Sequence, residues 1–394
     1  MTSTVCAFRT RVSIAVPLLS SKPSNRTKEE HMEKYLADQV PVGEILAEEL
    51  EQRDWSQTEF AEILGRPTQF VSEIMSGKKE ITRESAAQIA AALGPSAEFW
   101  LNIQNQYLLS RQAQDTKTQS QLSNVRLRAQ LNQLAPIAVL RKYGYVTGNS
   151  LDELEDEIRE LFEIESIDDE PVFAAAARRS NPDVPLTPTQ KAWLAVARRT
   201  ARTLTVAPLD MEAVAALAES LARRVRDVSV FADLATLLAE VGVRLVYVEA
   251  FPGSKMNGAT FLLDDDEAQP VIAISGRGKR LDKVLFTLLH ELAHLVRGDV
   301  RPGGIILIDD GEAHTMGDEN ATNQLAGDWA IPGGLPAPPR PLRQSWVSAQ
   351  ADRLGVHEIV VVGFLQHRRQ LDWRTQLVKG APSVTDQLSR WAPA

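Results

Sequence analysis

The chain has 394 residues, of which 44% are hydrophobic and 24% are charged, with a net charge of −9 and a single cysteine, Cys6. This length predicts two or three domains, the composition is that of an ordinary soluble globular protein, and no apolar run approaches the ~18 residues that span a bilayer. One cysteine excludes an intrachain disulfide and fits a reducing cytoplasm, and the negative charge argues against a generally basic nucleic-acid binder.

Residues 1–31 differ in composition from the rest. Residues 1–28 contain five Lys or Arg and no Asp or Glu. The stretch "VSIAVPLL" resembles the apolar region of a signal peptide, but no A-x-A-like site follows it closely. We therefore expect a disordered leader or a mis-extended start before Met32, with a targeting peptide as the alternative.

The first patterned segment, residues 40–107, predicts a helix-turn-helix. Ser56 and Glu59 form a capping box that starts one helix, Gly65 ends it, and Gly77 ends a second. The two helices carry apolar stripes, namely Phe60, Ala61 and Leu64, then Phe70, Val71 and Ile74.

The exposed side of the second helix predicts a DNA-reading surface. Thr, Gln and Ser side chains reach base edges in a major groove, and nearby basic and amide groups hold phosphates. The predicted base-reading residues are Thr68, Gln69 and Ser72, and the predicted phosphate contacts are Gln57, Lys78, Lys79 and Arg83.

The alternative is a helical hairpin that only packs against another element. Residues 32–107 hold 6 Lys or Arg against 13 Asp or Glu, a net charge of −7. Non-specific DNA affinity depends mainly on phosphate neutralisation, so we expect weak binding by a monomer.

This segment resembles the HigA-type antitoxin repressors of the Xre helix-turn-helix superfamily. The resemblance implies a homodimer that represses its own operon, with operator DNA and a toxin protein as partners. Pro67, which fits the first turn of the second helix, departs from the serine cap of simpler members. The matching residues are Pro41, Gly43 and Glu44, "WSQ" at 55–57, "SGKK" at 76–79 and "EFWLNIQ" at 98–104.

Residues 108–240 form a predicted helical linker and middle region. A polar stretch, "SRQAQDTKTQSQLSN", comes first, and helical segments such as "LDELEDEIRELF" and "PTQKAWLAVARRTAR" follow. No residue here has the spacing of metal ligands, so we expect this region to connect the domains.

Residues 241–379 combine short strands with a long helix. The stretches "VGVRLVYVEA", "GATFLL" and "PVIAIS" read as strands, and 281–296 reads as a helix. That helix contains "LLHELAHLV", which places His290, Glu291 and His294 in the pattern H-E-x-x-H.

This pattern predicts a catalytic zinc site. His290 and His294 lie one turn apart on one helix face, so both imidazoles can bind one Zn²⁺ at ~2.0–2.1 Å. Glu291 lies ~100° around the helix and is expected to take a proton from the attacking water. The alternative is a core helix whose histidines pair with buried acceptors.

A third ligand is required. The metzincin pattern fails, because Arg297 and Val300 occupy the positions of its glycine and third histidine. The helical stretch "ENATNQLAGDWAIP", 319–332, begins with Glu319 on its inward side, so we favour Glu319 over His314, which lies in an acidic, glycine-rich loop. The downstream candidates are Glu312, His314, Asp318 and Glu319.

The segments "SKMNGATFLLDDDEAQPVIAISGRGKRLDKVLFTLLHELAHLVRGD" and "ENATNQLAGDWAIP" resemble the ImmA/IrrE metallopeptidase family, whose members cut transcriptional repressors. The resemblance implies that His290, His294 and Glu319 bind zinc and that Glu291 is the catalytic glutamate. It further matches Asn323, Ala326 and Pro332, while Thr322 and Leu325 depart from the pattern, and His357 and His367 are expected to be structural.

The expected fold is mainly α with a small β-sheet. It comprises a helix-turn-helix bundle, a helical middle, an α+β zincin-like domain and a tail at 380–394. The expected function is a DNA-binding regulator whose zinc endopeptidase cuts a repressor, a toxin–antitoxin protein or this chain itself. The alternative is a non-catalytic HigA-type antitoxin whose zinc domain is a sensor or a partner-binding platform.

Overall fold

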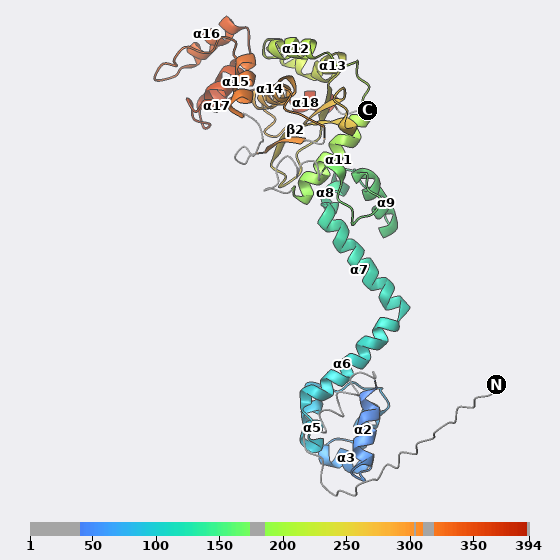
Figure 1. Cartoon of the computed structure of the whole chain (residues 1–394). Helices are drawn as coiled ribbons and strands as arrows, with labels where there is room; N and C mark the ends of the chain where they lie inside the picture. Colours follow the sequence, from blue (N-terminus) through green and yellow to red (C-terminus); the bar gives the residue numbers. More distant parts are fainter. Residues whose placement is uncertain (1–39, 174–185, 303–304, 310–318, 392–394) are drawn as a thin grey trace, which may run out of the picture. The chain divides into compact units, whose positions relative to one another are not determined.

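The protein is described by a computed structural model, and the chain divides into two compact units, Met1–Ser123 and Asn124–Ala394 (Figure 1). We describe each unit by itself and call them the first and the second unit. The predicted leader lies outside the described residues. The structure describes residues 40–173, 186–302, 305–309 and 319–391, with the backbone alone at 305–309 and 319.

The first unit consists of helices, and its turn residues explain where two of them begin and end. Ser56 and Glu59 form the predicted capping box at the start of α3, and Gly65 ends α3 with φ 65°. Gly77 follows α4 with φ 69°. The helices are α2 (Val42–Glu51), α3 (Gln57–Leu64), α4 (Thr68–Met75), α5 (Arg83–Leu93) and α6 (Ala97–Gln114).

Two residues of the first unit show why its core packs closely. A Cβ added to Gly43 would lie 2.2 Å from the carbonyl oxygen of Met75, so only glycine lets α2 approach the end of α4. Gln104 of α6 is buried and accepts a hydrogen bond from the Ile81 amide (2.6 Å) while donating one to the Ile81 carbonyl (3.0 Å). Gln104 thereby joins α6 to the segment between α4 and α5.

The second unit begins within α7 (Thr116–Leu134), which crosses the division between the units. Most of the predicted middle region therefore belongs to the same unit as the sheet. The helices before the sheet are α8 (Ile137–Lys142), α9 (Leu151–Phe162), α11 (Pro188–Arg202), α12 (Met211–Arg224), η1 (Val228–Asp233) and α13 (Leu234–Glu240).

A four-stranded mixed sheet forms the centre of the second unit. Its order is β1-β3-β2-β4, with β1 parallel to β3 and the other neighbours antiparallel. Three strands fall where the sequence predicts them, and the fourth was not predicted. The strands are β1 (Arg244–Tyr247), β2 (Met256–Leu262), β3 (Pro270–Ile274) and β4 (Ile305–Asp309), and η2 (Leu263–Asp265) follows β2.

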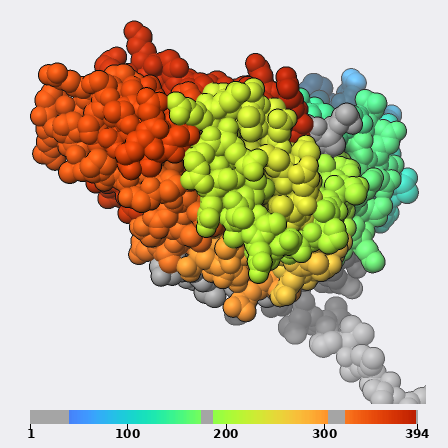
Figure 2. All heavy atoms as spheres, turned by 90° about the horizontal axis from the view of Figure 1, so that it is seen from above, coloured from blue at the N-terminus to red at the C-terminus, as the bar shows by residue number. Residues whose placement is uncertain are grey.

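The helices that follow β3, together with α12 and α13, cover one face of the sheet. Figure 2 shows α12 and α13, in yellow-green, against the orange and red C-terminal segment. The elements after β3 are α14 (Leu281–Arg297), α15 (Glu319–Ala330), α16 (Gln344–Leu354), α17 (Glu358–His367), η3 (Gln376–Val378), α18 (Thr385–Leu388) and η4 (Ser389–Trp391).

Alternate residues of β1 and β3 point to different cores, as the two-residue period of a strand requires. Leu245 and Ile272 pack with α12, α14 and α17, whereas Val246 and Val271 pack with α9 and α11. The second unit therefore has three layers, with the sheet between two layers of helices. Helix α14 belongs to one of the helical layers and packs directly against the sheet. The prediction of a mainly helical chain with a small sheet is confirmed.

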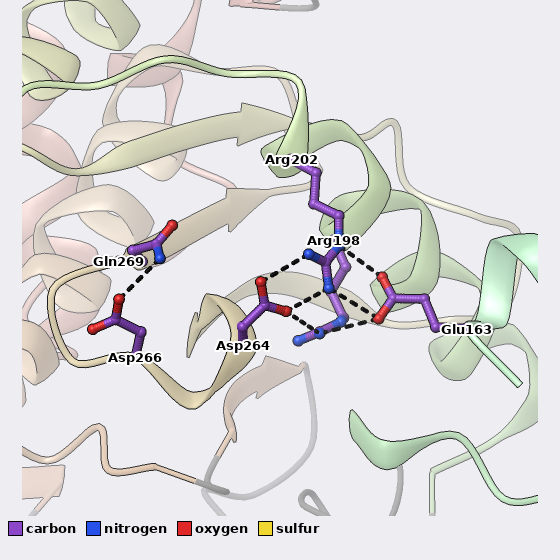
Figure 3. A network of polar contacts seen from close by, with 6 residues as sticks. All are labelled: Glu163, Arg198, Arg202, Asp264, Asp266 and Gln269. Atoms are coloured by element: carbon purple, nitrogen blue, oxygen red, sulfur yellow. Dashed lines mark hydrogen bonds and ion pairs between the residues drawn. The ribbon is translucent and has the colours of Figure 1, made fainter.

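An ion-pair network fixes the middle helices to the turn after β2 (Figure 3). Arg202 of α11 donates hydrogen bonds to Glu163 at the end of α9 (2.9 Å) and to Asp264 (2.8 Å). The Arg202 hydrogen bond holds the pKa of Asp264 below its ordinary value. Arg198 lies 3.4 Å from Glu163 and so adds a second guanidinium to the same carboxylate.

No helix in the described part of the chain is long and apolar enough to cross a membrane.

Candidate functional site

The helix-turn-helix of the first unit presents its predicted DNA-reading residues to solvent. Val71 and Ile74 of α4 are buried, as the predicted stripe requires, while Phe70 is only half-buried. Pro67 is the cap that precedes α4 rather than its first helical residue. All seven predicted DNA contacts are exposed: Gln57, Thr68, Gln69, Ser72, Lys78, Lys79 and Arg83.

Glu73 connects two of these residues. Its carboxylate accepts a hydrogen bond from the Gln69 amide nitrogen (2.8 Å) and lies 3.7 Å from the Lys79 ammonium. The Lys79 ammonium and the Arg66 guanidinium also lie over the Phe70 ring, at 5.0 Å and 5.4 Å from its centroid. Phe70 packs at the edge of the core with two cations near its ring, and Glu73 offsets part of the positive charge at the end of α4.

The second candidate site lies on α14. His290 and His294 are 6% and 1% exposed, and their Nε2 atoms face each other at 3.0 Å. Two nitrogens bound tetrahedrally to one Zn²⁺ would lie about 3.3 Å apart, given Zn–N bonds near ~2.05 Å. The imidazoles thus converge as the H-E-x-x-H spacing predicts.

The outer nitrogens of both rings face oxygen acceptors. Nδ1 of His294 lies 3.0 Å from the Asp299 carboxylate, and Nδ1 of His290 lies 3.1 Å from the Asn323 side-chain oxygen, so each ring can donate there in its Nδ1–H tautomer. In that tautomer each neutral ring presents a lone pair at Nε2. Two lone pairs at this separation repel each other, so the arrangement suits a cation between them. An outer acceptor behind each histidine is the usual surroundings of a metal-binding imidazole.

Asp299 is held in place by more than one partner. Its Oδ2 accepts from Arg297 Nε (3.1 Å) and lies 3.5 Å from the Thr322 hydroxyl of α15. Gly298 ends α14 with φ 71°, and the Asp299 amide returns a hydrogen bond to the His294 carbonyl (3.0 Å). Sequence reasoning missed Asp299, although the glycine that turns the chain back beside His294 is the signal that points to it.

Glu291 points to the sheet rather than toward the histidine partners. It is fully buried, and the Thr260 hydroxyl of β2 donates a hydrogen bond to its Oε2 at 2.5 Å. A Cβ on Gly258 would lie 2.5 Å from Glu291 Oε1, so the glycine provides space for the carboxylate. Sequence reasoning missed Gly258 and Thr260, because no local pattern announces which strand faces the helix.

Most of the residues predicted as a third ligand lie in the segment 310–318. The alternatives Glu312, His314 and Asp318 lie outside the described residues, and only the backbone of Glu319 is described, at the start of α15. Among the side chains that are described, no group of three or more His, Cys, Asp or Glu is placed to hold a metal ion.

The two histidines that we expected to be structural have packing partners. His357 caps α17 by accepting a hydrogen bond from the Ile359 amide (3.1 Å). His367 stacks on Phe286 with ring centroids 4.0 Å apart.

Comparison with known proteins assigns the first unit. Residues 46–100 match the helix-turn-helix family. The chain is 31% identical over 75 residues to the uncharacterized HTH-type transcriptional regulator YddM of Escherichia coli, an alignment that covers 19% of this chain and 80% of the relative. It is 35% identical over 86 residues to an uncharacterized HTH-type transcriptional regulator of Haemophilus influenzae, covering 22% of this chain and 80% of that protein. The chain belongs to the helix-turn-helix transcriptional regulators.

DNA binding by this regulator therefore rests on its family as well as on its geometry. The match at 46–100 contains α3, α4, α5 and the turn after α4, which together carry all the exposed polar residues described above. Which of these residues touch bases and which touch phosphates stays a prediction. The family match ends at residue 100 and does not include α14, so the family match gives no information on the site there.

Proposed function

We propose that the regulator binds its operator as a homodimer and carries a zinc endopeptidase in its second unit. In this proposal Thr68, Gln69 and Ser72 read bases, whereas Gln57, Lys78 and Lys79 hold phosphates. A dimer is favoured because one unit with more carboxylates than basic residues neutralises few phosphates, and two copies double the contacts. The substrate class is a repressor, a toxin–antitoxin protein or this chain itself.

One observation carries the peptidase proposal: the Nε2 atoms of His290 and His294 face each other at 3.0 Å while both Nδ1 atoms are held by acceptors. In a metal-free pair of neutral rings with both Nδ1 atoms as donors, two Nε2 lone pairs would oppose each other, and relief would require the other tautomer of one ring or a proton shared between the two Nε2 atoms. A Zn²⁺ between the two nitrogens removes this conflict, which supports zinc over a purely structural pair.

The position of residue 319 also supports the proposal. Glu319 stands one turn before Asn323 on α15, and residues four apart share a helix face. Asn323 contacts His290, so helical spacing is the reason to expect residue 319 on the same face of α15. We therefore retain Glu319 as the third ligand of the proposed site.

The residues of the chain divide the proposed chemistry among them. When bound, zinc supplies a Lewis acid that polarises the peptide carbonyl and makes water a usable nucleophile near pH 7. Glu291 accepts the proton of the attacking water at a carboxylate oxygen and passes it to the leaving amine. The hydroxyl of Thr260 holds the carboxylate against β2, and Asp299 with Asn323 keeps both imidazoles in the binding tautomer.

A non-catalytic second unit is the alternative, and one observation favours it. Glu291 is fully buried against Thr260 and Gly258, as a structural carboxylate would be. In that case the second unit serves as a zinc-containing platform for a partner protein, and the antitoxin role of the first unit remains.

Metal content and cleavage separate these possibilities. Metal analysis of the purified chain is expected to find about one zinc per chain, lost in His290→Ala but kept in the matched control His357→Ala. Finding no zinc in the folded wild-type chain would overturn the metal site.

Cleavage is then followed on a library of peptides from a bacterial proteome and on the chain itself, with fragments identified by mass spectrometry. We expect wild type to cut and Glu291→Gln to bind zinc without cutting. Zinc binding with no cleavage by wild type would leave the platform alternative.

A further inference from the structure

An aromatic row runs along the surface of the second unit from the proposed metal site. Phe286 lies one turn before His290 on α14, with ring centroids 6.4 Å apart. The imidazole of His367, the last residue of α17, stacks on Phe286 at 4.0 Å with an interplanar angle of 22°. Trp373 then meets His367 edge-on at 5.5 Å and 82°.

The outer end of this row is open to solvent. Trp373 is 47% exposed, and the Lys283 ammonium lies 5.1 Å from its ring centroid, which leaves a rigid, cation-backed aromatic surface. Desolvation of the imidazole lowers the pKa of His367 to about 4, while the residue as a whole stays exposed. The row therefore offers aromatic faces and no carboxylate of its own.

Its position distinguishes this row from other exposed apolar groups. The large apolar side chains exposed in the described part of the chain are Ile63, Leu109, Leu122, Val125, Val172 and Trp373. Of these, Trp373 is the one that a chain of ring contacts joins to His290. The row therefore offers an exposed aromatic surface, at Trp373, that is joined through ring contacts to a buried polar centre.

We propose that Phe286, His367 and Trp373 form a subsite for an aromatic or large apolar side chain of the peptide to be cleaved. This inference rests on the proposed zinc endopeptidase and deepens it by naming the class of residue next to the cleaved bond. The row begins beside a proposed zinc ligand and leads from Phe286 of α14 to His367 at the end of α17 and on to Trp373, so a side chain near the cleaved bond would meet the row from its Phe286 end. Offset and edge-on ring contacts then favour an aromatic side chain over a small one.

Two small probes test the subsite without requiring the natural substrate. Each is a hydroxamate, which binds zinc, and one carries a benzyl and the other a methyl side chain. Binding to the zinc-loaded full chain is measured by calorimetry. The benzyl compound is expected to bind wild type about tenfold more tightly than the methyl compound, a difference of about 1.4 kcal/mol.

The variants separate selectivity from folding. Trp373→Ala removes a half-exposed side chain and is expected to reduce the benzyl preference to less than about threefold, whereas Trp373→Phe retains most of it, because stacking needs only an aromatic face. Affinity for the methyl compound stays within about twofold of wild type in both, and Val172→Ala, an exposed apolar truncation elsewhere, changes neither affinity.

The other possible affinities of the two compounds would each overturn the subsite. Equal affinities of the two compounds for wild type would overturn the subsite while leaving the zinc site intact. An equal loss of both affinities in Trp373→Ala would also overturn it, since the tryptophan would then support the fold rather than select a side chain. Binding of neither compound to wild type would overturn the proposed zinc site and the subsite with it.

Discussion

The two units place their candidate residues in opposite surroundings. In the first unit the candidate DNA contacts are exposed on α3, α4 and the turn after α4, and buried residues only support them. In the second unit His290, Glu291 and His294 are themselves buried, and each is held by a side chain from another segment. A surface for DNA needs a stable scaffold beneath it, whereas a metal site needs a polar lining around it.

The scaffold of the first unit gives the largest expected effect. Replacing Gln104 by leucine leaves the buried amide and carbonyl of Ile81 without their side-chain partner. Each unsatisfied buried group costs ~1–3 kcal/mol, so we expect Gln104→Leu to destabilise this unit by about 2–5 kcal/mol and to weaken operator binding at 37 °C. Hydrogen exchange of the α4 and α5 amides in the full chain measures the loss. The exposed Gln106→Leu on the same helix is the control, and equal exchange in the two variants would refute the clamp.

The polar lining of the second unit gives the next effect. Asp299→Asn keeps the size of the side chain but weakens its acceptor for His294 Nδ1. Outer partners of metal-binding histidines typically contribute 10–100-fold to metal affinity, so we expect a zinc affinity about 10–100-fold lower with little change in unfolding temperature. Competition with a chelator measures it, and the exposed Asp328→Asn of α15 is the control. Unchanged affinity in Asp299→Asn would mean that the contact does not serve a metal site.

The DNA surface gives a smaller effect per residue. The double change Lys78→Ala with Lys79→Ala is expected to reduce the slope of log affinity against log salt by about 2, since each phosphate contact contributes ~0.9. Glu73→Gln is expected to strengthen binding, because the carboxylate now lies 3.7 Å from Lys79. Operator titrations at several salt concentrations measure both, with Lys117→Ala as the control. A slope unchanged in the double variant would place the phosphates elsewhere.

The sequence predicts local features of this fold well, for physical reasons. Capping by Ser56 and the left-handed turn at Gly65 depend on a few neighbouring residues, and the apolar period of α14 depends on one helix. The convergence of His290 and His294 is equally local, because four residues span one helical turn.

The rest of the site depends on contacts between distant segments. Thr260 and Gly258 face Glu291 because β2 lies under α14, and Asn323 reaches His290 because α15 packs beside it. Phe70 has the period of a core residue, yet it packs only at the edge of the core, where cations from the neighbouring turns approach its ring. Such contacts are set by packing, which no short pattern encodes.

The smallest expected effect concerns the network that fixes the middle helices to the sheet. The Arg202 hydrogen bond lowers the pKa of Asp264 in the folded state, so the pair stabilises the fold above the ordinary carboxyl pKa near ~4. That stability is lost as the pH falls through the lowered pKa and both forms of the chain protonate. Because Arg202 and Asp264 are 38% and 51% exposed, solvent screening limits the contribution to about 1 kcal/mol or less.

Arg202→Gln is therefore expected to lower the free energy of unfolding by about 0.5–1 kcal/mol at pH 7 and by less below pH ~4. Urea titrations of the full chain across this pH range measure the difference, monitored in the second unit. Arg226→Gln, which breaks the more exposed pair with Asp352, is the matched control and is expected to change stability less. A deficit in Arg202→Gln that stays the same on acidification would contradict the assigned charge effect, and would mean that the arginine acts through packing and not through its charge.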